Sequence, residues 1–176
     1  MKNPLPITQG EYPSFYETYV SKVIAAYEHN PWQAFRVQAE ELPDWLEQVP
    51  EEKQQFRYEE GKWSVREVIG HMTDAERIFG IRALHFARQE GQALIGFDEK
   101  AYVQVANFDD LAWSVLLNNF RTARLANLAM FETFEDSWWE NQGTASGASF
   151  TLGSMPYIMV GHVLHHVHIL RERYGL

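Results

Sequence analysis

Apolar residues recur every three or four positions along most of this chain, which is the spacing that places them on one face of a helix. The spacing predicts a short helix over residues 14–28 and long helices over residues 31–49, 63–89 and 109–134, with a last helix from residues 151–155 to Tyr174. Pro43 is expected to kink or divide the second helix, because proline removes a backbone donor and clashes with the preceding turn. Strand signals are poor. The pattern therefore predicts an all-α fold, a four-helix bundle with a short extra N-terminal helix.

The clearest helix start in the chain is the segment Trp-Ser-Val-Arg-Glu-Val, which begins at Trp63. Ser64 and Glu67 have the spacing of a capping box, in which each residue bonds the backbone N–H of the other. Trp63 and Val68 have the spacing of a hydrophobic staple, which fixes the direction in which the chain enters the helix. This helix is therefore the best defined element of the predicted bundle.

Three segments without helical spacing are predicted to be connections, at residues 50–62, 91–108 and 141–149. The second is long and irregular, and such loops in compact domains are often functional. The third is rich in glycine and serine and is expected to be a loop. Asp109 is expected to cap the helix that follows the second connection, and Gly175 to end the last helix.

The size and charge of the chain limit its organisation and its partners. Its 176 residues correspond to one domain, so we expect a single domain over residues 1–176 with residues 1–30 as an N-terminal extension packed on the bundle. The net charge is -9, and without a basic face we expect no nucleic-acid partner. No segment approaches the about 18 consecutive apolar residues of a membrane span, and no signal peptide is recognisable. We therefore expect no membrane partner and a cytoplasmic location.

The most informative stretch is Gly-His-Val-Leu-His-His-Val-His at residues 161–168, which holds four of the seven histidines. On a helix, His162 and His166 lie within about 40° of each other and about 6 Å apart along the axis. They fall within an apolar stripe, where an unpaired imidazole costs about 1–3 kcal/mol. Since the chain has no cysteine, any metal must be held by nitrogen and oxygen. This pair is therefore predicted to bind a metal ion, with His165 as the alternative to His166.

A catalytic metal ion needs a third protein ligand, and His71 is the best candidate. It lies in the middle of a predicted helix at the edge of the apolar stripe, whereas the remaining histidines lie nearer helix ends or point elsewhere. Asp74 follows three residues later, within about 60° on the helix. It is a candidate catalytic residue that orients His71 or a water. An ion pair with Arg77 or Arg82 explains Asp74 equally well.

Several segments together resemble a known family. They are Lys-Trp-Ser-Val-Arg-Glu-Val-Ile-Gly-His at residues 62–71, Asp-x-Glu-Arg at residues 74–77 and Gly-His-x-x-His-His at residues 161–166. In this order and spacing the chain resembles the DinB-like superfamily of small four-helix-bundle metalloproteins, which includes bacillithiol S-transferases and mycothiol-dependent isomerases. The resemblance implies a bundle of the DinB-like type in which His71, His162 and His166 bind one metal ion.

Three neutral imidazoles leave coordination positions for other groups, so such a site can lower the pKa of a water, polarise a substrate oxygen or hold a thiol as its thiolate. We therefore expect a metal-dependent enzyme that acts on a small-molecule substrate, either a thiol-dependent S-transferase or a hydrolase. The sequence contains no H-E-x-x-H, E-x-x-H or phosphate-binding glycine loop, which argues against zincin proteases, ferritin-like di-iron proteins and P-loop enzymes.

The expected cofactor is one divalent transition metal ion, zinc or nickel first, with iron, cobalt or manganese as alternatives. A low-molecular-weight thiol is a further expected cosubstrate. The alternative from another functional class is a non-catalytic metal-binding stress-response protein of the same fold. A homodimer is expected on base rates for soluble proteins.

Overall fold

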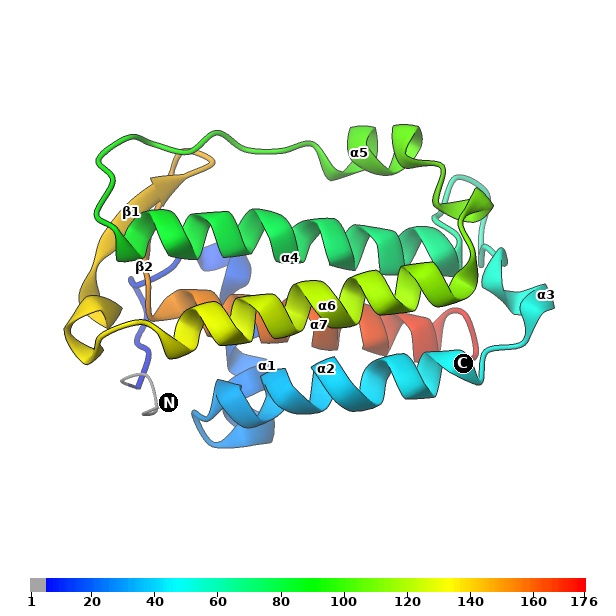
Figure 1. The fold of residues 1–176 in the computed structure, drawn as a ribbon, viewed down its shortest axis with the longest axis horizontal. Helices are drawn as coiled ribbons and strands as arrows, with labels where there is room; N and C mark the ends of the chain where they lie inside the picture. The colour runs from blue at the N-terminus through cyan, green and yellow to red at the C-terminus, as the bar shows by residue number, and fades with distance from the viewer. Residues whose placement is uncertain (1–5) are drawn as a thin grey trace.

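A computed structural model describes residues 6–176, and four long helices form its body (Figure 1). These helices are α2 (Pro31–Glu47), α4 (Val65–Ala87), α6 (Trp113–Glu132) and α7 (Ser154–Glu172). Both α4 and α2 pack against α6 and α7, so the four helices close into a ring around a shared interior. The predicted all-α four-helix bundle is confirmed. None of the helices in the described part is long and apolar enough to cross a membrane.

The other described elements are short. They are η1 (Ser14–Tyr16), α1 (Glu17–Tyr27), α3 (Glu51–Gln54), α5 (Glu99–Ala106), η2 (Phe108–Asp110), η3 (Asp136–Glu140), β1 (Gln142–Ala145) and β2 (Ala148–Thr151). Together η1 and α1 confirm the short helix predicted over residues 14–28, and α1 packs against α7 and α2. The first five residues of the predicted N-terminal extension lie outside the described residues.

Helix α4 begins where the sequence predicts, with a complete capping box. The Glu67 backbone N–H donates to Ser64 Oγ at 3.0 Å, and the Ser64 backbone N–H donates to Glu67 Oε2 at 2.7 Å. Asp109, in contrast, does not cap α6. It lies in η2, and its carboxylate accepts from Ser64 Oγ and Arg57, whereas α6 starts after Ala112 without a side-chain cap. Asp109 therefore ties η2 to the start of α4.

All three predicted connections contain regular structure, and residues 50–62 include the short helix α3. Within residues 91–108, Asp98 accepts from the backbone N–H groups of Lys100 and Ala101 and starts α5. Within residues 141–149, β1 and β2 form an antiparallel hairpin. Its two turn residues, Ser146 and Gly147, have φ values of 53° and 75°, and positive φ at both positions matches the twist of a two-residue hairpin.

The sequence predicted a kink or a division of the second helix at Pro43, and helix α2 is not divided there. The helix runs continuously from Pro31 to Glu47 with Pro43 buried inside it. Proline costs the helix one backbone hydrogen bond and crowds the preceding turn. Since α2 packs against α6, α7 and α1, burial of its apolar face stabilises the helix through this position.

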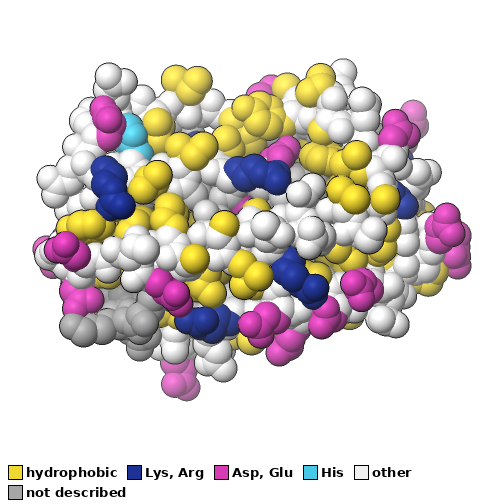
Figure 2. Space-filling model, viewed as in Figure 1, with side chains coloured by type: hydrophobic (Ala, Val, Ile, Leu, Met, Phe, Trp, Pro, Cys, Tyr) yellow, Lys and Arg dark blue, Asp and Glu magenta, His cyan; other side chains and the backbone are white. Residues whose placement is uncertain are grey.

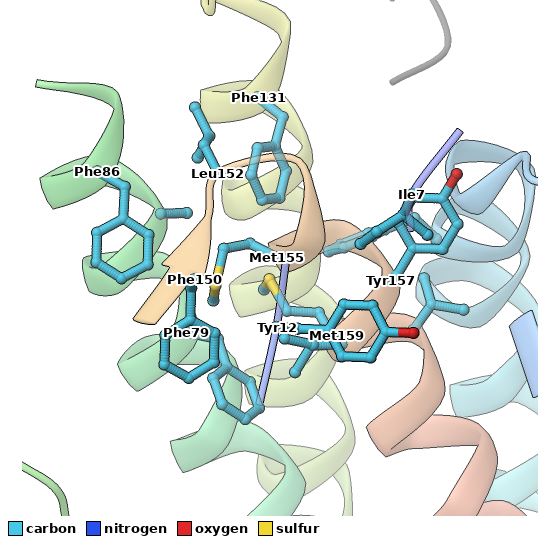
Figure 3. Packing of buried hydrophobic residues seen from close by; sticks show 14 of the residues in the cluster. Ile7, Tyr12, Phe79, Phe86, Phe131, Phe150, Leu152, Met155, Tyr157 and Met159 are labelled. Carbon is cyan, nitrogen blue, oxygen red and sulfur yellow. The ribbon is translucent and has the colours of Figure 1, made fainter. Parts of the chain in front are cut away.

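The apolar interior consists of two clusters stacked along the bundle. The hairpin-end cluster includes Phe79, Phe86, Phe131, Phe150 and Met155, whose side chains converge from α4, α6, β2 and α7 (Figure 3). The opposite-end cluster includes Leu46, Val68, Met72, Phe120 and Leu170. On α4 the change from one cluster to the other falls between Met72 and Ala75, and on α7 between Val160 and Val163. Polar side chains are buried in this middle region.

Candidate metal centre

The structure brings the three predicted ligands together at the middle of the bundle. His71 comes from α4, and His162 and His166 come from the adjacent α7. The Nε2 atom of His162 lies 3.0 Å from Nε2 of His71 and 3.1 Å from Nε2 of His166. All three side chains are buried, with no more than 8% of any residue exposed. One ligand atom from each lies within 4.8 Å of the others, so the three form a group that could hold a metal ion.

Glycines directly before two of the histidines allow neighbouring segments to pack closely here. A Cβ atom on Gly161 would lie 2.5 Å from the backbone oxygen of Tyr19 on α1. A Cβ atom on Gly70 would lie 2.4 Å from the ring of Phe108 in η2. Such contacts are too short for any larger residue without movement. The glycines therefore let α1 and η2 approach α7 and α4 next to the histidines.

The donor set of this triad fits a cation better than it fits hydrogen bonds. Each neutral imidazole offers one N–H donor and one lone pair. His162 Nε2 is close to two other Nε2 atoms, and a single proton on it can bridge to only one of them. Its other nitrogen, Nδ1, is buried with no hydrogen-bond partner among the described residues. A cation between the three lone pairs would satisfy the Nε2 atoms together.

The distances between the nitrogens agree with this assignment. A zinc–nitrogen bond is about 2.0–2.1 Å, so two nitrogens on one ion at angles of 90–110° lie about 2.8–3.4 Å apart. The two separations from Nε2 of His162, 3.0 and 3.1 Å, fall within that range. The residues present therefore fit a divalent ion with nitrogen ligands.

Burial keeps these imidazoles in the form that binds metal. Desolvation lowers the pKa of His71 to about 4, although the charge of Glu99 opposes the shift. Desolvation also lowers the pKa of His162 and of His166 well below the usual value, with further lowering from the neighbouring imidazoles. A histidine ligand must be neutral. At neutral pH all three are therefore ready to bind a cation.

A cavity of about 370 Å³ lies beside the triad and is called the metal cavity below. His71, His162 and His166 form part of its wall, and Phe79 and Tyr19 add aromatic surface. Two further lining residues, Phe15 and Glu99, are exposed, so the cavity reaches the molecular surface. Its size is at the lower end of the about 300–1,000 Å³ range of ligand pockets, which suits a small molecule.

Asp74, the candidate catalytic residue, is not among the residues that line the metal cavity. Its half-buried carboxylate accepts from Arg77 at 3.2 Å. The structure therefore favours the ion pair over the orienting role. His165, the alternative ligand, lines the metal cavity but does not belong to the triad, and its ring lies 5.2 Å from that of Tyr19.

Sequence reasoning missed the other groups in this cavity. Glu99 is the carboxylate among its described lining residues, and Tyr16 and Tyr19 come from the N-terminal elements. Burial raises the pKa of Tyr16, opposed by Arg82, and it also raises the pKa of Tyr19. Glu99 lies in a segment predicted as an irregular connection, and no local pattern places it near His71. A weak signal existed for Phe79, which is eight residues after His71 and about 80° from it around α4.

The family of the chain follows from a comparison with known families. The model of the DinB superfamily matches residues 34–170, so the chain belongs to the DinB superfamily. The matched segment includes all three histidines of the triad. No curated protein sequence matches the chain significantly.

Two solved structures share the fold. One is YfiT from Bacillus subtilis, described as a probable metal-dependent hydrolase with an unusual four-helix bundle topology. It is 22% identical, with a TM-score of 0.73, over 82% of this chain and 86% of that chain. The other is the mycothiol-dependent maleylpyruvate isomerase, 14% identical, with a TM-score of 0.62, over 88% of this chain and 62% of that chain. At these identities the likeness establishes a common fold.

Proposed function

We propose that this protein is a divalent-metal-dependent enzyme that acts on a small molecule, and hydrolysis is the first candidate reaction. The observation that carries the proposal is the convergence of three buried Nε2 atoms, from His71, His162 and His166, at the wall of a cavity of about 370 Å³. The description of YfiT as a probable metal-dependent hydrolase supports the same chemistry. Zinc or nickel suits three imidazole ligands best.

The three histidines would hold the ion, and the remaining lining residues would handle the substrate. When bound, the ion supplies Lewis acidity, which polarises a substrate oxygen or lowers the pKa of a nucleophile. Phe79 and Tyr19 bury the apolar part of the substrate and exclude bulk water from around it. Glu99 offers the carboxylate that can accept the proton of the nucleophile.

Thiol-dependent transfer is the second candidate reaction. The chain has no cysteine, so a sulfur nucleophile would have to come from a separate small thiol. The likeness to the mycothiol-dependent maleylpyruvate isomerase favours this reaction. The non-catalytic alternative, a metal-binding stress-response protein, requires an enclosed ion, whereas the triad here adjoins a cavity that reaches the surface.

The test is a pair of assays on protein purified without an affinity tag and loaded with zinc or with nickel. Hydrolysis of p-nitrophenyl acetate reports the first reaction, and conjugation of cysteine to monochlorobimane reports the second. We expect one activity to require metal, to disappear in His166→Ala and to fall by about 10²–10⁴-fold in Glu99→Gln. Asp74→Asn is the matched control and should keep the activity. A loaded protein inactive in both assays would contradict the enzymatic proposal.

A further inference from the structure

A second cavity, of about 410 Å³, adjoins the metal cavity and is called the lysine cavity below. Trp63 and His166 line both cavities, so the two meet at one of the three triad histidines. The ring of Trp63 lies 4.7 Å from that of His71, and its backbone oxygen accepts from the hydroxyl of Tyr174, which lines the lysine cavity. Trp63 is therefore held in place as the wall between them.

The lining of the lysine cavity is positively charged, in contrast to the chain as a whole. Lys62 and Lys100 line it, and no aspartate or glutamate is among its described lining residues. The chain carries a net charge of -9, and on the face drawn in Figure 2 acidic side chains gather along the lower margin, over α2. Lys62 lies over the ring of Tyr58, with its Nζ 6.0 Å from the centroid. Two ammonium groups at one cavity within an acidic protein favour an anionic ligand.

Helix α5 divides its charges between the two cavities. Its first residue, Glu99, lines the metal cavity, and the next, Lys100, lines the lysine cavity. Tyr58, Trp63 and Tyr174 line the same cavity and add apolar surface to the lysines and His166. A molecule with an anionic end and a short carbon chain matches this combination of lining groups.

We propose that the lysine cavity binds the carboxylate end of a small substrate or cosubstrate whose reactive group lies in the metal cavity. This inference rests on the proposed function and narrows its substrate class to small carboxylic acids. Lys62 and Lys100 pair with the carboxylate, and the aromatic walls cover the carbon chain. The cavity thereby orients the reactive group towards the histidine triad.

The experiment measures binding rather than turnover, with cobalt in place of the native ion. Cobalt-loaded protein is titrated with 3-mercaptopropionate and, as its neutral match, 3-mercaptopropanol, and then with the corresponding six-carbon pair. The sulfur-to-cobalt absorption band reports binding of each probe. We expect at least one anionic probe to bind about tenfold more tightly than its neutral match, the effect of a partly screened ion pair.

The preference should disappear in Lys62→Ala/Lys100→Ala, and the neutral probes should bind that variant as they bind the parent. Lys62→Arg/Lys100→Arg should keep the preference. Lys53→Ala is the matched control, because Lys53 lines neither cavity and donates to the Gly175 oxygen elsewhere.

The outcomes separate this inference from the proposed function. A protein that takes up no cobalt would overturn the metal site and this inference with it. A protein that takes up cobalt but binds both members of each pair equally, or neither member, would overturn the inference alone. A preference that survives in the double alanine variant would also overturn it.

Discussion

Two polar clusters lie in the middle of the bundle, and they differ in the kinds of groups they bring together and in their access to a cavity. In the arginine cluster, Arg124 from α6 donates to Glu76 of α4 and to Gln38 of α2. Asn127 also donates to the carboxylate of Glu76, at 3.1 Å. Gln38 donates to the Val160 oxygen on α7 at 3.1 Å. The Arg124 and Glu76 side chains are at most 1% exposed. This cluster joins all four helices, and its ion pair is sealed from solvent.

The histidine triad lies nearby but is left open. Its Nε2 atoms face one another, so like groups meet where the arginine cluster sets a cation against a carboxylate. Each cluster holds one buried nitrogen without a partner among the described residues, Nδ1 of His162 and Nε of Arg124. It also adjoins two cavities, whereas Glu76 and Arg124 line none of those described. Burial of polar groups alone therefore does not mark a functional site. Three imidazoles that converge next to a cavity do.

The largest effect is expected from opening the sealed cluster. Arg124→Ala leaves the carboxylate of Glu76 buried without its cation, and this should lower the free energy of unfolding by about 3–5 kcal/mol. Urea unfolding followed by circular dichroism measures the loss. Replacing both partners, as in Glu76→Leu/Arg124→Met, should lose much less, because no charge then remains unpaired. If Arg124→Ala had the same free energy of unfolding as the parent, this would contradict the structural role of the cluster.

A somewhat smaller effect is expected from acidifying the metal-free protein. The pKa of His71 is about 4 in the folded chain and 6.5 when exposed, so below 6.5 the unfolded chain binds a proton that the folded chain does not. The contribution of neutral His71 to the free energy of unfolding should therefore be fully present above pH 6.5. It should fall by about 3 kcal/mol as the pH falls to about 4. Urea unfolding across this range, compared with His71→Leu, isolates the share of His71. A parent and variant with the same pH dependence would contradict the prediction.

The third effect has the opposite sign. His162→Leu removes a buried imidazole whose Nδ1 has no described partner, so metal-free His162→Leu should be more stable than the metal-free parent by about 1–3 kcal/mol. The same variant should lose its affinity for zinc, measured by calorimetric titration. If His162→Leu instead destabilises the metal-free protein strongly, the triad is a packing element like the arginine cluster.

The smallest effect is expected at the half-exposed pair of Asp74 and Arg77. Asp74→Asn removes one surface ion pair, which is worth about 0.5 kcal/mol. Metal affinity should be unchanged, because Asp74 does not line the metal cavity. A large loss of metal affinity in this variant would restore the orienting role that the sequence suggested.

The helical spacing of apolar residues predicted the bundle well. Helical spacing and the capping box at Ser64 located the long helices to within a few residues, because these signals are local to each helix. The hairpin was missed because its strands have four residues each and its turn is Ser-Gly rather than a strong turn pair. Helix α5 was missed because its N-cap residue, Asp98, was the single local signal for it.

The site was predictable only where its residues share a helix or a family pattern. His162 and His166 are four residues apart, and His71 was selected by its place at the edge of an apolar stripe and then supported by the resemblance. Glu99 and the lysines at positions 62 and 100 reach the two cavities through the path of α5 and of the segment before α4, which no local pattern encodes. Tertiary packing decides these placements.

Metal content per chain tests directly whether the triad is a metal centre. Protein purified without an affinity tag is incubated with zinc or nickel, dialysed and measured by elemental mass spectrometry, beside His71→Ala and His166→Ala. We expect about one ion per chain in the parent and far less in both variants, which should remain folded by circular dichroism. A parent that stays metal-free, or variants that bind as much as the parent, would contradict the assignment of the triad as a metal centre.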